Sequence, residues 1–66
     1  MRSSFVAKYK DQARGFRIKA QGARMIAETM STLEGRETVL QIALHYDKLA
    51  ARFEELAKSH DDSDLP

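Results

Sequence analysis

The sequence predicts an all-α fold in which two antiparallel helices form a hairpin and two hairpins pair into a dimeric four-helix bundle. The composition is poor in helix breakers, with one proline and three glycines among 66 residues. Apolar residues recur at alternating spacings of three and four along both halves of the chain, which is the period of an amphipathic helix. A short polar segment with helix-capping residues separates the two halves.

The first helix is expected at about residues 4–30. Its apolar row keeps the alternating spacing without a break, and half of its members are alanine. Such a row is typical of a helix that packs lengthwise against another helix. The members of the row are Val6, Tyr9, Ala13, Phe16, Ala20, Ala23, Ala27 and Met30.

The connection between the helices contains residues that start helices. The side chain of Ser31 or Thr32 can accept hydrogen bonds from the free N–H groups at the beginning of a helix. Ser31 followed three residues later by Glu34 also matches a capping box. Because the connection has only a few residues, the two helices must be antiparallel neighbours.

The second helix is expected at about residues 33–59, so that residues 1–59 form the hairpin. Its main row has large side chains, and alanines at every seventh position lie beside it, at Ala43, Ala50 and Ala57. We expect small side chains of the first helix to pack against large ones of the second. The predicted core is Tyr9, Ala13, Phe16, Ala20, Ala23, Ala27, Met30, Val39, Ile42, Tyr46, Leu49, Phe53 and Leu56. Residues 60–66 are polar and acidic and are expected to be a disordered tail.

The first helix carries a second row of small and apolar residues, on the side away from its alanines. Each glycine in a helix interior costs about 0.5–1 kcal/mol relative to alanine. Two glycines in register beside exposed apolar residues therefore indicate that another helix comes close. We predict a self-association surface of Gly15, Ile18, Gly22 and Met25, with Leu40 and Leu44 contributing. An unidentified protein partner could use the same surface, and scattered surface apolar residues are the simpler alternative.

The segment from Ala27 to Glu54 reads AETMSTLEGRETVLQIALHYDKLAARFE. Its pattern of A-E-x-M, an acidic residue and arginine at the turn, and L-x-I-A-x-x-Y-x-x-L-A-x-R-x-E resembles a family of short, uncharacterised helical-hairpin proteins of alphaproteobacteria. The family's turn is commonly D-P-E, where this chain has Thr32, Leu33 and Glu34. The resemblance covers under half of the chain; it implies a hairpin and a bacterial cytosolic origin, and it implies no activity. The matching positions are Ala27, Glu28, Met30, Glu34, Arg36, Leu40, Ile42, Ala43, Tyr46, Leu49, Ala50, Arg52 and Glu54.

The sequence offers no constellation of catalytic, cofactor-binding or metal-binding residues. His45 lies one helical turn from Gln41 and two from Glu37, but no second histidine shares that face and no H-E-x-x-H spacing occurs. His60 and the aspartates after it fit a solvated acidic tail better than a cation site. We therefore expect a protein that is not an enzyme and that has no cofactor.

Charge is distributed unevenly between the two halves of the chain. Residues 1–30 have seven basic and two acidic side chains, a net charge of +5, whereas residues 31–66 have four basic and eight acidic ones, a net charge of −4. Four cations share one stripe of the first helix, which makes nucleic-acid binding by a small dimer the alternative function. No aromatic residue interleaves with this stripe for stacking on bases. The stripe is Lys10, Arg14, Arg17 and Arg24.

Together these observations predict a small protein–protein interaction or assembly module that forms a homodimer. No apolar run reaches the length of a membrane span, and an alanine-rich row would insert little apolar area into a membrane surface. We expect a cytoplasmic protein without a membrane partner.

Overall fold

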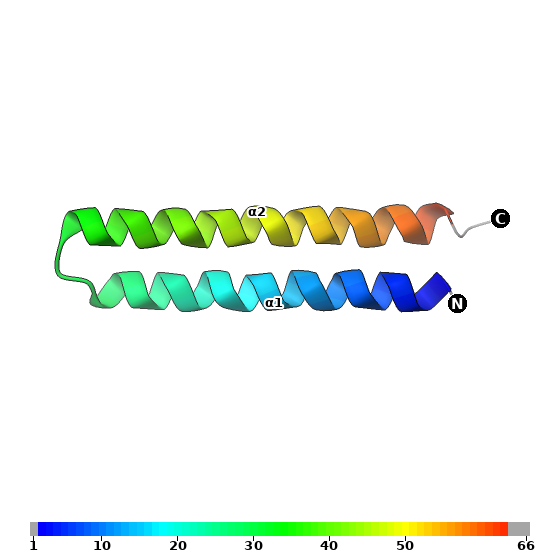
Figure 1. Cartoon of the computed structure of the whole chain (residues 1–66), viewed down its shortest axis with the longest axis horizontal. Coiled ribbons are helices and arrows are strands. Elements are labelled where there is room, and N and C mark those ends of the chain that lie inside the picture. The colour runs from blue at the N-terminus through cyan, green and yellow to red at the C-terminus, as the bar shows by residue number, and fades with distance from the viewer. Residues whose placement is uncertain (1, 64–66) are drawn as a thin grey trace.

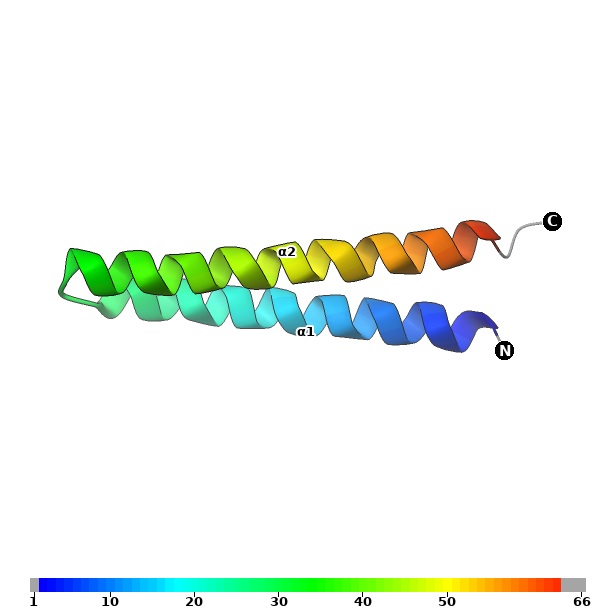
Figure 2. The same ribbon diagram turned by 45° about the horizontal axis from the view of Figure 1, so that its top comes forward.

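A computed structural model describes the backbone of residues 2–63 and the side chains of residues 5–59. Helix α1 spans Arg2–Thr29 and helix α2 spans Leu33–Ser63. The two helices lie side by side and antiparallel along their whole length, with the start of α1 and the end of α2 at the same end of the hairpin (Figures 1 and 2). The predicted all-helical hairpin is confirmed.

The helix ends differ from the expected ones by a few residues. Helix α1 ends at Thr29 rather than at residue 30, and α2 continues to Ser63 rather than stopping at residue 59. Residues 60–63 of the expected tail are therefore helical. Nothing in them breaks a helix, because the chain's one proline is at position 66. The rest of the predicted tail, residues 64–66, lies outside the described residues.

Thr32 caps the start of α2. Its Oγ1 accepts a hydrogen bond from the backbone N–H of Gly35 at 3.1 Å, and its carbonyl accepts one from the N–H of Arg36, also at 3.1 Å. Because α2 begins at Leu33, the residue three positions after the cap is Gly35 and not Glu34. The cap is therefore Thr32 alone, and the expectation of a Ser31–Glu34 capping box is wrong.

Arg36 ties the end of α1 to α2. Its Nη2 donates a hydrogen bond to the carbonyl oxygen of Met30 at 3.1 Å, while the N–H of Met30 donates to the carbonyl of Ala27 at 3.2 Å. The last carbonyls of a helix lack partners within the helix. Arg36 satisfies one of them from the neighbouring helix and so holds the turn closed.

The core of the hairpin is made of small side chains from both helices. The expectation that alanines of the first helix pack against large side chains of the second is wrong: Ile42, for example, is exposed. With alanine at every seventh position in both helices, packing alanine against alanine allows the closest approach of the two backbones. The larger side chains are then displaced to the flanks. Apart from Val6, the buried side chains of residues 5–59 are Ala13, Ala20, Ala23, Ala27, Ala43, Ala50 and Ala57.

Aromatic rings lie along one flank of the alanine rows and fix the register of the helices. Phe16 stacks between two rings of α2, with centroids 6.0 Å from Tyr46 and 5.7 Å from Phe53, and Tyr9 lies 6.1 Å from Phe53. This register places Ala13 level with Ala50. We call this flank the aromatic face; it comprises Phe5, Tyr9, Phe16 and Ile26 of α1 and Ile42, Tyr46, Leu49, Phe53 and Leu56 of α2.

The alanine rows yield a first prediction, on two neighbouring residues of α2. Ala50 is completely buried, whereas Ala51 is exposed. Ala50→Leu forces the backbones apart and should lower the free energy of unfolding by about 1–3 kcal/mol. Ala51→Leu should change it by less than about 0.5 kcal/mol. Urea unfolding followed by far-UV circular dichroism measures both, and equal effects of the two substitutions would contradict alanine-on-alanine packing.

The turn yields a second prediction. A Cβ atom at Gly35 would lie 2.7 Å from Cε of Met30 and 2.9 Å from Oγ1 of Thr32. Gly35→Ala should therefore displace the cap and lower the free energy of unfolding by about 1 kcal/mol, although alanine is the better helix former. Gln41→Ala, on an exposed position of the same helix, is the control and should be nearly neutral. If thermal unfolding shows that Gly35→Ala is more stable than the wild type, a Cβ atom at this position does not displace the cap.

Candidate interaction surfaces

The structure places the predicted self-association residues on two different sides of the hairpin. In α1, Ile18 and Met25 point away from α2 and are 63% and 66% exposed. In α2, Leu40 and Leu44 are also exposed, but Leu40 lies beside Arg24 and Arg36 on a flank of the hairpin. The six residues are all accessible, yet within one hairpin they do not join into a single patch.

Gly15 and Gly22 are not required by the packing of the hairpin itself. A Cβ atom built on either glycine meets no other atom within 4 Å, and neither has a positive φ. Within one hairpin, alanine would fit both positions and would favour the helix. Packing within the hairpin therefore gives no reason for glycine at these two positions.

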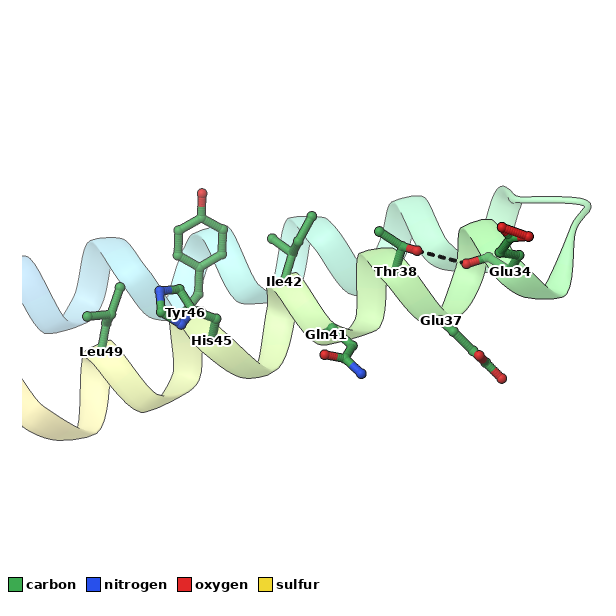
Figure 3. A pocket seen from close by; sticks show the side chains of 8 residues that line it. All are labelled: Glu34, Glu37, Thr38, Gln41, Ile42, His45, Tyr46 and Leu49. Carbon is green, nitrogen blue, oxygen red and sulfur yellow. Dashed lines mark hydrogen bonds between the residues drawn. The ribbon is translucent and has the colours of Figure 1, made fainter.

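The aromatic face is a partly accessible apolar surface: Phe5, Ile26 and Ile42 are exposed, and its other members are half-buried. Apart from Phe5 and Ile26, the residues of this face were expected in the core, and so the sequence interpretation missed them as a surface. A groove on this flank of α2 is lined by Glu34, Glu37, Thr38, Gln41, Ile42, His45, Tyr46 and Leu49. Figure 3 shows Ile42, Tyr46 and Leu49 projecting to the same side of α2, while Glu37 and Gln41 point the other way. All the lining residues belong to α2, so the groove is bounded by the side chains of one helix only.

The charged side chain of Lys19 lies over two rings of the aromatic face. Its Nζ is 5.7 Å from the ring centroid of Phe16 and 5.9 Å from that of Tyr46. A cation over an aromatic ring is attracted by the ring's electron-rich face. The long aliphatic part of the side chain covers ring surface while the ammonium group stays at the edge.

The opposite flank of the alanine rows is held by ion pairs. Arg17 pairs with Glu54 at 2.9 Å and with Asp47 at 3.2 Å, and Arg24 pairs with the second oxygen of Asp47. These contacts join α1 to α2, so the opposite charges of the two halves meet within a single chain. Exposed ion pairs are individually weak, but a shared network of them fixes register.

The basic stripe is largely occupied by these contacts. Arg17 and Arg24 face acids of α2, and Arg14 lies 3.8 Å from Asp11 one turn earlier in its own helix. Within the described residues, Lys10 is the one member of the stripe without an ion pair. A phosphate that approached Arg17 or Arg24 would have to displace a carboxylate.

The network shifts the pKa values of its members. The hydrogen bond from Arg24 is the largest effect on Asp47 and holds its pKa below the usual value, and Arg17 adds to this. The hydrogen bond to Glu54 raises the pKa of Arg17. Both groups are therefore charged at neutral pH, and the pairs persist over the physiological range.

The titratable residues considered at the sequence level do not form a metal site. His45 lines the groove on α2 together with Glu37 and Gln41. Among the described residues, no group of three or more His, Cys, Asp or Glu side chains is placed to hold a metal ion. The side chains of His60, Asp61, Asp62 and Asp64 lie outside the described part.

A search for membrane-spanning segments over the described residues finds no helix with enough length and apolarity to cross a bilayer.

Comparison of the chain with protein-family models, with curated proteins and with solved structures finds no match. The resemblance to alphaproteobacterial hairpin proteins therefore stays a prediction, and the function can be inferred from the geometry of the hairpin alone.

The ion pairs yield a third prediction, on pH dependence. A carboxylate whose pKa is lowered in the folded state stabilises the fold above its unfolded pKa of about 3.9 and loses that contribution as the pH falls below it. Asp47→Asn should therefore flatten the fall in the free energy of unfolding as the pH drops below about 4. Asp11→Asn, which removes an exposed contact within one helix, should leave the profile as in the wild type. If both variants show the wild-type profile, the ion pairs of Asp47 do not contribute to the free energy of unfolding.

Proposed function

We propose that this chain is a small, non-enzymatic helical module for protein–protein interaction or assembly, and that it self-associates through a helix face. The observation that carries the proposal is that the hairpin buries small side chains and leaves several large apolar side chains exposed. Among residues 5–59, nothing larger than Val6 is buried, while Phe5, Ile26, Ile42 and Leu44 are all about half exposed or more.

The burial of apolar surface is the main force that stabilises a fold, at about 25 cal/mol per Å². A row of alanines removes little such surface from water for each residue ordered, and chains of this size are marginal even with larger cores. The chain has no cysteine with which to form a disulfide. A partner that covers the large exposed side chains supplies the missing burial.

Nucleic-acid binding through Lys10, Arg14, Arg17 and Arg24 has weaker support. Arg17 and Arg24 are bonded to carboxylates of the same chain, and contacts with phosphate would have to replace these bonds at a net cost. We therefore do not propose it. The cytoplasmic location and the possibility of a different protein partner stay predictions of the sequence.

A fourth prediction follows from self-association. Light scattering after size exclusion, over a hundredfold range of concentration, should give twice the chain mass of 7.5 kDa. The thermal midpoint should rise with concentration, because association stabilises the folded state by mass action. A mass of 7.5 kDa throughout, with a midpoint independent of concentration, would contradict self-association and leave a different protein as the partner.

A further inference from the structure

The aromatic face is apolar and partly exposed along both helices. We propose that a second copy of the chain covers this face, and that the two copies lie with their turns at the same end of a four-helix bundle. The inference rests on the proposed self-association and adds which face pairs and in which orientation.

The exposed area of the hairpin fits the area that a stable dimer buries. The chain exposes 5297 Å², whereas a compact monomer of its mass is expected to expose about 4200 Å². The excess of about 1000 Å² is close to the roughly 800 Å² that each partner buries in a standard interface. The shape agrees with this, since the radius of gyration is 15.3 Å against about 11 Å for a compact chain of this length.

The aromatic face has the composition of an interface centre. Phenylalanine, tyrosine and large aliphatic residues line it from both helices, and such residues are enriched at the cores of interfaces. The groove beside Ile42 and Tyr46 is walled by α2 alone. A helix of a second copy would form the missing wall.

Charge selects the orientation of the second copy. Two hairpins packed face to face can be related by a two-fold axis along the helices or by one across them. An axis across the helices sets α1 against α1 and α2 against α2. An axis along the helices keeps both turns at one end and sets each α1 against the α2 of the other copy. The half of the chain with α1 has a net charge of +5 and the half with α2 has −4. The two-fold axis along the helices therefore brings opposite charges together.

A pair of substitutions on α2 tests which face is covered. Ile42 lies on the aromatic face and Leu44 does not, although their exposures are similar at 44% and 54%. Ile42→Glu buries a charge in the proposed interface of each copy and should weaken the dimer at least about tenfold. Leu44→Glu, the matched control, should leave the dissociation constant within about threefold of the wild type. Sedimentation equilibrium measures the constants, and circular dichroism checks that each variant remains helical.

The outcomes separate this inference from the proposed function. A wild-type monomer would overturn both. A wild-type dimer that Leu44→Glu or Ile18→Glu dissociates while Ile42→Glu does not would leave self-association standing and overturn the assignment to the aromatic face.

The orientation is tested by a single spin label. Because the chain has no cysteine, Ser31→Cys carries one label per copy at the turn. Turns at the same end should give label distances below about 30 Å by pulsed electron paramagnetic resonance. Turns at opposite ends would separate the labels by more than about 40 Å, the length of a helix of this size, and that result would overturn the orientation.

Discussion

The contact of alanine with alanine across the two helices is the constraint on which the rest of the hairpin depends. It recurs at every seventh residue, at Ala13, Ala20 and Ala27 of α1 and at Ala43, Ala50 and Ala57 of α2. Once these rows face each other, the residue three positions after Ala13, Ala43 or Ala50 lies on one flank and the residue four positions after it on the other. The first set includes the stacked rings and the second the ion pairs.

This division explains how the two helices are aligned. Stacked rings and cross-helix ion pairs fix the register of the helices on either side of the alanines. The alanines are buried and the stacked rings are half-buried, while large aliphatic side chains such as Ile42 and Leu44 are exposed. In the dimer that we propose, the aromatic face becomes the common core of both copies.

The sequence predicts the fold better than it predicts the surfaces. The two helices follow from the apolar spacing, and their antiparallel arrangement follows from the short connection. The apolar spacing does not reveal which row of α2 faces α1. The row with Ile42 and Tyr46 and the row with Ala43 and Ala50 are neighbours, and both have a helical period. The sequence does contain a pattern that marks the row facing the other helix. An alanine is followed by an aromatic residue three positions later and by a charged residue four positions later at Ala13, Ala43 and Ala50. The charged residue is basic in α1 and acidic in α2. The basic stripe could not be recognised as paired from one helix alone, since its carboxylate partners are some thirty residues away.

Isotope-filtered nuclear Overhauser spectroscopy on a mixture of labelled and unlabelled chains tests the central claim most directly, because it separates contacts within a chain from contacts between chains. The account predicts methyl contacts between Ala20 and Ala43 within one chain, and contacts from the Ile42 methyl groups to the other chain. Alanine methyl contacts that appear between chains, or Ile42 contacts confined to α1 of its own chain, would contradict it.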